Sequence, residues 1–418
     1  MSRARVAAGL ALVALGAASM LAGAARLWAR AGGVVDDGRM ARYGPYAPPG
    51  PAEPHVVWNG AALGLVWAVH GGREDPVDAV RFARFEADGR SLGSPRAVVA
   101  GERRTKLAAP RLAWSSAGAG WAVAWLRDHP DGGTWWAAGL APDGAARGEE
   151  RPLSGSGAVD GRCARFAPGK DGTFAAAWRT GDGRHDGRFR RIDAAGEPVG
   201  GEAQLWSAFD AAGCGDLSWS GREWAYVVGT WHADGRAGEV IFGRLSSRGE
   251  RLDDAAPLGV AGPSPEVSVA WDGRNWGVAW TEHEDGFVWF RLVPPDGPDA
   301  AHAAVLLGAR ARSPRIAATA DGFAVAWSRS DGIDEAVLEL ALVGADGNVA
   351  APARRVTDPA VASFDPSLAA LPGGGLVLAF VERRASGDLV LRLLRLDAAG
   401  VPRGEPREVS GGGSGDPG

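Results

Sequence analysis

The sequence lacks the short motifs that would assign it to an enzyme class. It contains no Gly-x-Ser-x-Gly nucleophile elbow, no phosphate-binding loop, and no dinucleotide-binding fingerprint between a strand and a helix. After the first 31 residues it also lacks a convincing segment with the 3.6-residue hydrophobic period of a helix, which argues against a helical solenoid. We therefore assign no catalytic residue, and we predict no cofactor and no metal site.

Lysine is almost absent, and basic residues form no cluster. Lys106 and Lys170 are the only lysines, so arginine supplies nearly all the positive charge. Residues 1–31 carry four arginines and no acidic residue, and without them the formal net charge falls from −5 to −9. A surface of that sign disfavours nucleic acid and anionic lipid, so we expect neither as a partner.

The N-terminus has the pattern of a secretory leader. Arg3 and Arg5 precede an uncharged stretch over residues 6–25, and Ala22-Gly-Ala24 and Ala29-Arg-Ala31 are small-x-small cleavage sites. We predict a signal peptide in residues 1–31, export to the periplasm or beyond, and a linker over residues 32–53. A stretch of about 20 apolar residues also spans a bilayer, so an uncleaved inner-membrane anchor stays open as the alternative.

What the chain does contain is a strand-rich repeat with a period of about 50 residues. Its clearest mark is a second strand that ends on an aromatic or apolar residue, found as Leu65-Val-Trp67, Trp121-Ala-Val-Ala-Trp125, Phe174-Ala-Ala-Ala-Trp178, Trp224-Ala-Tyr-Val-Val228, Trp276-Gly-Val-Ala-Trp280, Phe323-Ala-Val-Ala-Trp327 and Leu376-Val-Leu-Ala-Phe380. Each copy reads as four short strands, with x-Asp-Gly or x-Ala-Gly supplying the positive φ of a tight hairpin.

Four strands in each copy are typical of a β-propeller blade. We predict an all-β fold: a single propeller of seven four-stranded blades over residues 54–410, followed by a flexible tail over residues 411–418. An eighth blade would have to lie in residues 32–53, which read as linker. The tryptophans of the second strand are expected in the core, because each blade packs between two neighbours. We expect a monomer.

This pattern resembles the tandem-repeat β-propellers of exported bacterial proteins, in the broad company of TolB-like and kelch-like propellers. The resemblance covers nearly all of the chain after the leader and implies the fold. It supplies no catalytic motif, and such propellers have diverse functions. The kelch double-glycine signature is not consistently present, and the marks of the WD repeat are missing.

Only two cysteines occur, Cys163 and Cys214, and they lie about one repeat apart. Both fall at the start of the first strand of neighbouring blades, and first strands usually line the central channel. Export permits oxidation, so we predict a disulfide between blades 3 and 4. A pair of free buried thiols, or a metal-binding or catalytic pair, are the alternatives.

The loops after the second strands hold most of the unusual polar residues, and strand alternation places all of these loops on one face. The starts of the inner strands reach the same face. A ligand site is expected where variable loops meet a rigid scaffold. The candidate residues are His55, His70, Arg111, Arg127, His129, His185, His232, Glu266, Glu282, His283, Arg315, Arg329 and Glu382.

Three functions fit this arrangement. The leading one is a non-catalytic exported scaffold that binds a protein or glycan partner through the loop-rich face. The second is a carbohydrate-active hydrolase or lyase that uses acidic or histidine residues at the channel mouth. The third is a structural component of the cell envelope. Polar loops are also common on any exposed surface, so the sequence names no ligand.

Overall fold

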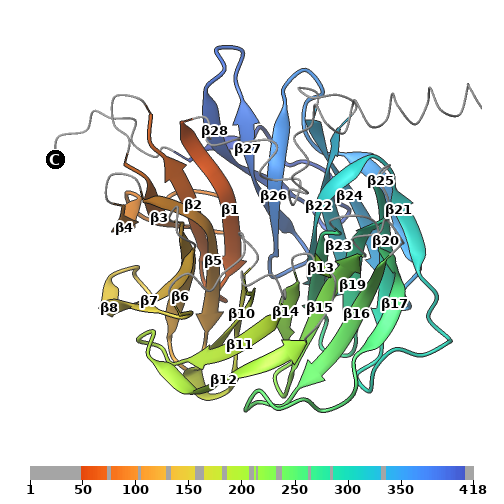
Figure 1. The fold of residues 1–418 in the computed structure, drawn as a ribbon. Helices are drawn as coiled ribbons and strands as arrows, with labels where there is room; N and C mark the ends of the chain where they lie inside the picture. The colour runs from red at the N-terminus through yellow and green to blue at the C-terminus, as the bar shows by residue number, and fades with distance from the viewer. Residues whose placement is uncertain are drawn as a thin grey trace, which may run out of the picture. The chain divides into compact units, whose positions relative to one another are not determined.

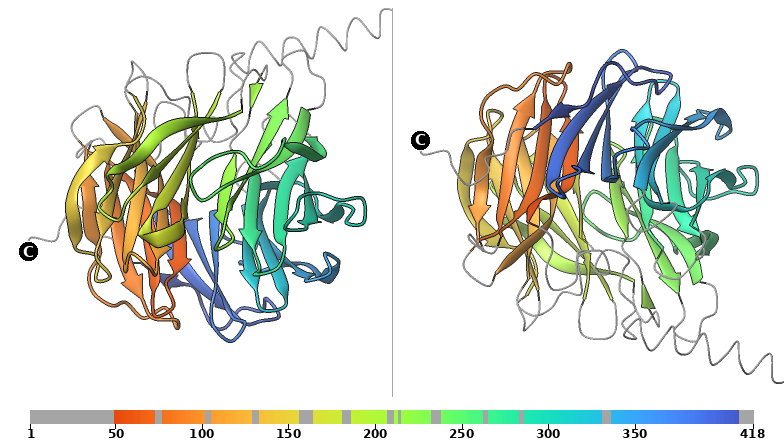
Figure 2. Two further views of the ribbon diagram at one scale, coloured as in Figure 1. Left: turned by 90° about the horizontal axis from the view of Figure 1, so that it is seen from below. Right: turned by 90° about the horizontal axis from the view of Figure 1, so that it is seen from above.

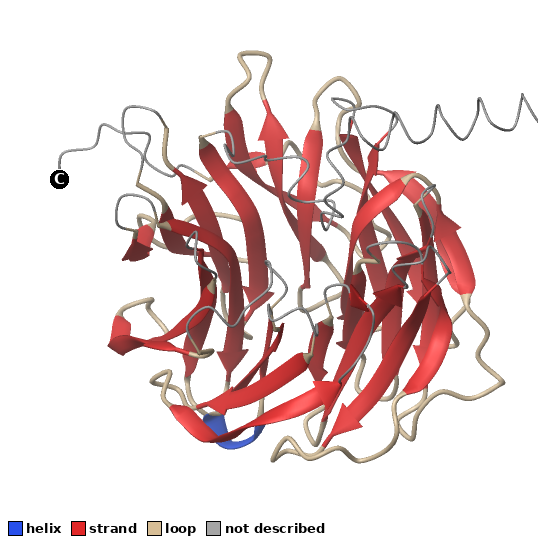
Figure 3. Ribbon diagram, in the orientation of Figure 1, coloured by secondary structure: helices blue, strands red, loops and turns tan. Residues whose placement is uncertain are grey.

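The computed structural model describes residues 49–72, 77–101, 105–128, 133–155, 164–180, 186–206, 211–212, 215–231, 238–261, 265–282, 286–330 and 336–409. These residues form seven antiparallel sheets that stand around one axis as the blades of a β-propeller (Figure 1, Figure 2). The predicted all-β, seven-bladed fold is therefore confirmed. One short 3-10 turn, η1 (Lys170–Gly172), is the only helical element in this part of the chain (Figure 3).

The strands of each blade follow one another in chain order from the axis outward. Blade 1 contains β1 (Gly50–Trp58), β2 (Leu63–His70), β3 (Ala79–Phe85) and β4 (Arg96–Ala100). Blade 2 contains β5 (Lys106–Ser115), β6 (Gly120–Asp128), β7 (Thr134–Leu140) and β8 (Ala146–Pro152). Blade 3 contains β9 (Arg165–Pro168), β10 (Phe174–Arg179), β11 (Gly187–Ile192) and β12 (Pro198–Trp206).

The remaining four blades repeat this order. Blade 4 has an inner strand in two pieces and contains β13 (Ala211–Ala212), β14 (Asp216–Trp219), β15 (Trp224–Trp231), β16 (Gly238–Leu245) and β17 (Ala256–Ala261). Blade 5 contains β18 (Val267–Trp271), β19 (Trp276–Glu282), β20 (Phe287–Val293) and β21 (Val305–Gly308). Blade 6 contains β22 (Ala311–Thr319), β23 (Gly322–Ser330), β24 (Ala336–Gly344) and β25 (Val349–Arg355). Blade 7 contains β26 (Ser363–Ala370), β27 (Leu376–Arg383), β28 (Leu389–Leu396) and β29 (Arg407–Glu408).

The predicted leader and tail lie outside the described residues, and so do Cys163 and Cys214 with their predicted disulfide. Strand β1 begins at Gly50, inside the segment expected to be linker. In the described part of the chain no helix is both long and apolar enough to cross a membrane.

The Trp-Ala-Val-Ala-Trp strand has two unlike faces, and this difference joins the blades. In β6, Trp121, Val123 and Trp125 are fully buried and pack against blade 1. The small residues between them, Ala122 and Ala124, pack against blade 3. Large side chains from one blade therefore fill the space left by small side chains of the preceding blade. The expectation that these tryptophans are core residues is confirmed.

The same large-on-small packing closes the ring between the two ends of the chain. Leu65 and Trp67 of blade 1 pack against Val377 and Ala379 of blade 7 in one buried cluster. No sheet of the described residues contains strands from both blade 1 and blade 7. Figure 2 shows the red-orange strands of blade 1 beside the dark blue strands of blade 7. In the described residues, side-chain packing and a hydrogen bond from the Val56 N–H to Ser367 Oγ hold this closure without a shared strand.

Glycine in the turn between the third and fourth strands serves both the turn and the neighbouring blade. Gly144 has a φ of 87°, which favours glycine. A Cβ at this position would lie 2.7 Å from the ring of Phe82 in blade 1. Gly400 repeats both features, with a φ of 72° and a Cβ position 2.6 Å from Leu340 of blade 6. The x-Asp-Gly and x-Ala-Gly turns thus also set the spacing between blades.

Candidate functional site

One position on every inner strand carries a polar side chain, and five of the seven reach the next blade. On the neighbouring second strand, the residue opposite this position is the next-to-last residue of the Trp-Ala-Val-Ala-Trp motif. Arg111, for example, is opposite Ala124, and Arg315 is opposite Ala326. We call the seven residues at this position the axial ring: they are His55, Arg111, Arg165, Asp216, Ser268, Arg315 and Ser367.

In four blades a β-bulge sets the direction of the axial-ring residue. The register of the inner strand shifts just before the ring residue in blades 1, 2, 6 and 7. Each bulge has a non-glycine residue with positive φ followed by proline. A residue before proline avoids the right-handed helical region, and an extra residue turns the next side chain to the other face. The four residues are Glu53 (φ 52°), Ala109 (φ 49°), Ser313 (φ 53°) and Asp365 (φ 53°).

Four axial-ring residues accept a hydrogen bond from the backbone of the next blade. His55 Nδ1 accepts the Leu112 N–H at 3.1 Å, which joins blade 1 to blade 2. Because Nδ1 is the acceptor, the neutral His55 ring carries its proton on Nε2. The other three bonds run from Val56 N–H to Ser367 Oγ at 3.0 Å, from Val269 N–H to Asp216 Oδ2 at 2.8 Å, and from Ile316 N–H to Ser268 Oγ at 3.4 Å.

The other three members of the axial ring are arginines, which share one conformation. Arg111 and Arg165 are buried, with 5% and 7% of their surface exposed, and Arg315 is half-buried. The Nε of Arg165 lies 3.3 Å from Oδ1 of Asp216 in the next blade. In all three, Nη1 donates to the carbonyl of the preceding residue, at 2.9 Å for Pro110, 3.1 Å for Ala164 and 2.8 Å for Pro314.

The environment of His55 lowers the pKa of its ring. Burial lowers the pKa of the His55 imidazole well below its ordinary value, and the positive charges of Arg111, Arg315 and Arg165 lower it further. The hydrogen bond with the Leu112 backbone opposes this shift only in part. At neutral pH, His55 is therefore an uncharged ring within a positively charged group of side chains.

The structure brings together only part of the predicted site. Three of the predicted residues, His55, Arg111 and Arg315, belong to the axial ring. Glu266 lies two residues before Ser268, and its Oε1 accepts the Ser313 hydroxyl of blade 6 at 3.3 Å. Sequence reasoning missed Arg165, Asp216, Ser268 and Ser367. Aligning the first strands on their second-strand partners would have placed Arg165 in the same position as the other two arginines.

Three other predicted residues are in ion pairs within their own blades. Arg127 pairs with Glu150 across blade 2, and the Cζ of its guanidinium group lies 4.1 Å from the ring centre of Trp136. The Arg329–Glu339 pair in blade 6 and the Glu382–Arg392 pair in blade 7 each measure 2.8 Å. These pairs cross between strands of one sheet.

The predicted His70 is buried and forms part of the contact between blades 1 and 2. Its Nδ1 lies 3.1 Å from Asp78 Oδ2, and the same carboxylate accepts the N–H groups of Gly71 and Leu107. Burial raises the pKa of Asp78, but the hydrogen bonds from His70 and the two backbone groups outweigh it, so the pKa lies below its ordinary value. Glu282 is half-buried at the end of β19. The remaining candidates, His129, His185, His232 and His283, lie outside the described residues.

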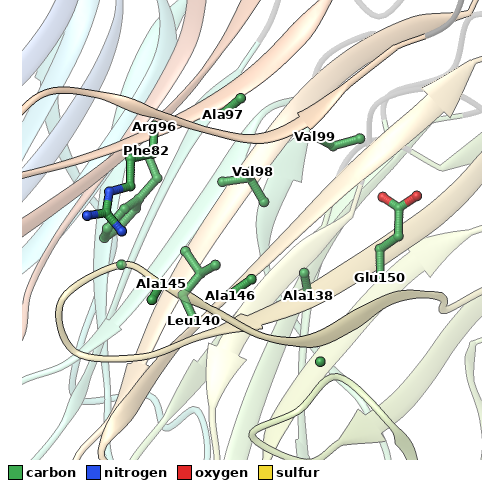
Figure 4. A pocket seen from close by; sticks show the side chains of 12 residues that line it. Phe82, Arg96, Ala97, Val98, Val99, Ala138, Leu140, Ala145, Ala146 and Glu150 are labelled. Carbon is green, nitrogen blue, oxygen red and sulfur yellow. The ribbon is translucent and has the colours of Figure 1, made fainter. Parts of the chain in front are cut away.

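A groove at the rim between blades 1 and 2 contains none of the predicted residues. It has a volume of about 330 Å³, and Phe82, Val98 and Leu140 contribute to its apolar lining. Figure 4 shows Arg96 and Glu150 on opposite sides of this lining. Glu150 of this groove pairs with Arg127. Among the described residues, no group of three or more His, Cys, Asp or Glu side chains is placed to hold a metal ion.

No family model matches the chain, and no curated protein matches its sequence. The fold is similar to the β-propeller domain of the trilobed protease from Pyrococcus furiosus, which has an open velcro topology (TM-score 0.51, 9% identity, 87% of this chain and 96% of that chain). It is also similar to a puromycin-hydrolyzing peptidase from Mycobacterium tuberculosis (TM-score 0.51, 14% identity, 87% of this chain and 53% of that chain). A protein of unknown function from Dyadobacter fermentans has a TM-score of 0.47 at 12% identity, over 82% of this chain and 93% of that chain. The first two similarities show the propeller fold alone.

Proposed function

We propose that this chain is an exported, non-catalytic β-propeller scaffold that binds a protein or glycan partner on the face where the inner strands begin. The observation that carries the proposal is a contrast between two sets of positions. Positions between blades repeat the same large-on-small packing, whereas the axial ring and the loops after the second strands differ from blade to blade. Positions that differ on a repeating scaffold are those that distinguish one ligand from another.

Export rests on the leader pattern in residues 1–31 and on the resemblance to exported TolB-like and kelch-like propellers. Mass spectrometry of the purified native chain tests it. A mature N-terminus at or just after one of the two small-x-small sites is expected. A full-length chain found in the membrane fraction would support the anchor instead, and a full-length chain in the cytoplasm would contradict export.

Binding is tested with the mature chain on an array of neutral and acidic oligosaccharides and immobilised peptides. One variant replaces residues 384–388, which follow the second strand of blade 7, by a two-residue Asn-Gly turn. The matched control shortens residues 372–375, a turn at the opposite end of the same strand. The first variant should lose binding and the control should keep it, with both folded by circular dichroism. Equal binding by both variants would contradict the proposed face.

The alternative is a carbohydrate-active hydrolase or lyase. One observation favours it: three acidic residues, Glu53, Glu266 and Asp365, each stand two residues before the axial-ring residue of their own blade. Polysaccharide that binds to the chain should stay intact if the chain is a scaffold. Release of oligosaccharides, abolished by Glu266→Gln with binding retained, would replace the scaffold proposal by the enzyme.

A further inference from the structure

We infer that the groove at the rim between blades 1 and 2 binds an arginine side chain presented by a partner protein. The groove is lined by residues of the third and fourth strands and of the turn between them, so the inference goes beyond the proposed function of the loop-rich face. Its volume of about 330 Å³ falls within the range of about 300–1,000 Å³ that is typical of ligand sites.

The first argument concerns one apolar residue that stands on, or directly after, each fourth strand and packs toward the next blade. In blades 2 to 7 this residue is buried; the six are Leu153, Leu205, Leu258, Leu307, Val356 and Val409. In blade 1 it is Val98, which stands at the register shift between β3 and β4 as Leu258 stands at that between β16 and β17. Val98 is only half-buried and lines the groove. The contact between blades 1 and 2 is therefore open at its outer edge.

At two interfaces an arginine of the next blade crosses to this apolar residue. Arg190 of blade 3 and Arg291 of blade 5 occupy the same place on the third strand, opposite the middle residue of the Trp-Ala-Val-Ala-Trp motif. Arg190 Nη1 donates to the carbonyl of Leu153 at 2.8 Å, and Arg291 Nη1 donates to that of Leu258 at 2.7 Å. The repeat thus has a site for an arginine side chain between the outer strands of two blades.

Four other interfaces close the same edge with other side chains. In blade 4 the Tyr226 hydroxyl donates to the carbonyl of Leu205 at 3.5 Å. In blade 7 a buried leucine, Leu394, stands at the third-strand position. The alanines of blades 6 and 1, Ala341 and Ala83, are buried in one cluster with the apolar fourth-strand residue of the preceding blade.

Blade 2 has the surroundings of Arg190 without the arginine. Its residue at the third-strand position is Ala138, which lines the groove. In blade 3, Glu202 Oε2 lies 3.7 Å from Arg190 Nη2, and Glu150 has the corresponding place on the fourth strand of blade 2. Glu150 and Val98 both line the groove. A partner arginine therefore meets the same kind of carbonyl and carboxylate that the chain arranges for one of its own arginines.

Glu150 can accept a second guanidinium group beside that of Arg127. Arg127 pairs with Oε1 of Glu150, and an ionised carboxylate has acceptor sites on both oxygens. Glu202 is shared in this way in blade 3, where Oε1 lies 3.7 Å from Arg188 Nε and Oε2 lies 3.7 Å from Arg190 Nη2. A planar guanidinium group suits such sharing better than an ammonium group does.

Arg96 is the positive charge on the other side of the groove (Figure 4). It has an acidic neighbour in Asp143. The hydrogen bond from the Ala145 N–H lowers the pKa of the Asp143 carboxyl, and the charges of Arg96 and Arg84 lower it further. The partner arginine should therefore enter with its guanidinium group on the Glu150 side.

The test uses the full chain and N-acetyl-L-arginine amide as the probe, with N-acetyl-L-citrulline amide as its uncharged counterpart. Saturation-transfer nuclear magnetic resonance on the side-chain protons of the probe measures the dissociation constant. The arginine probe should bind in a saturable way, and the citrulline probe should bind at least about tenfold more weakly because it lacks the charge. Ala138→Arg supplies the arginine from the chain itself, as in blade 3, and should abolish binding. If this variant does not fold, Ala138→Leu copies blade 7 and should also abolish binding.

Two further variants separate the groove from the general charge of the surface. Glu150→Gln should weaken binding of the arginine probe at least about tenfold, since the charged acceptor is lost. The matched control Glu149→Gln removes the same charge at the next residue, whose side chain is 81% exposed, and should bind like the natural chain. No saturable binding by the natural chain, equal binding of the two probes, or equal binding by Ala138→Arg would overturn the inference.

A second arm uses the array of immobilised peptides and oligosaccharides. Peptides that contain arginine should bind the natural chain and fail to bind Ala138→Arg. The variant changed at residues 384–388 should keep this binding, because the groove belongs to blades 1 and 2. Binding of an oligosaccharide that is lost in Ala138→Arg, with no binding of arginine peptides, would overturn the inference and assign the groove to a glycan.

Discussion

The contacts between blades and the axial ring follow different rules in the same repeat. Between blades, each second strand places large residues against smaller residues of its neighbour, which are alanine or valine, and this holds from blade 1 to blade 7 and across the closure. In the axial ring, four blades carry a hydrogen-bond acceptor and three carry an arginine. The first set of positions specifies the ring, and the second distinguishes one blade from another. Substitutions in the two sets should therefore differ in their effect on stability.

The largest effect is expected from a core tryptophan. Trp276 is fully buried between blades 4 and 5 and lies 4.6 Å from the ring centre of Trp271 and 6.3 Å from that of Phe242. Trp276→Ala should lower the free energy of unfolding by about 3–5 kcal/mol, because it removes buried area and leaves a cavity. Urea denaturation measures the loss. If Trp276→Ala lowered the free energy of unfolding by less than an axial-ring substitution does, the proposed difference between the core and the axial ring would be wrong.

An acceptor of the axial ring should matter less than the core. Ser367 is buried, and its Oγ accepts the Val56 N–H at the closure between blades 7 and 1. Ser367→Ala leaves this N–H without its acceptor and should cost about 1–2 kcal/mol in urea denaturation. Ser268→Ala is the matched variant at a bond of 3.4 Å and should cost less. Equal losses would show that the closure is no more sensitive than an interior interface.

The pH dependence of stability should report the charges around His55. The folded-state pKa of His55 lies well below its ordinary value, so the unfolded chain binds a proton that the folded chain does not. Stability from this group is complete above about pH 6.5 and is lost as the pH falls toward the folded-state pKa. Between pH 7.5 and 5.5 the loss should be about 1 kcal/mol, measured as the difference between the natural chain and His55→Gln. An equal loss of stability in the natural chain and in His55→Gln would show that a group other than His55 causes the pH dependence.

The smallest effect is expected at an exposed ion pair. Arg384 pairs with Glu408 at the edge of blade 7, where both side chains are more than two-fifths exposed. Arg384→Ala should change the free energy of unfolding by no more than about 0.5 kcal/mol, because water and salt screen the pair. A larger change would mean that the short strand β29 depends on this pair.

The repeat could be predicted from the sequence because its signals are local. Trp121, Val123 and Trp125 alternate with alanine within five residues, and a glycine-containing turn separates the third strand of each blade from the fourth. The partners of these residues belong to the neighbouring copy of the same pattern, so the period alone places them. Fold class and blade number follow from these signals, and both are confirmed.

The axial ring was only partly predictable because its contacts join distant residues through bulged strands. The hydrogen bond from the Leu112 N–H to His55 Nδ1 joins residues one repeat apart. The bulge before each of these ring residues also changes which side chains of the inner strand lie on the same face. Arg165 stands within Cys163-Ala-Arg-Phe166, where the sequence pattern predicts a disulfide and gives no separate signal for the arginine. The histidines of the loops, such as His129 and His283, have no local pattern that fixes their neighbours, and their roles stay predictions.

The most direct test of the account is partner binding by the blade 7 variant in which Asn-Gly replaces residues 384–388, measured beside the variant shortened at residues 372–375. Both variants should stay folded, because the packing between blades is unchanged in each. Only the first variant should lose binding. Binding kept by the first variant and lost by the second would contradict the account.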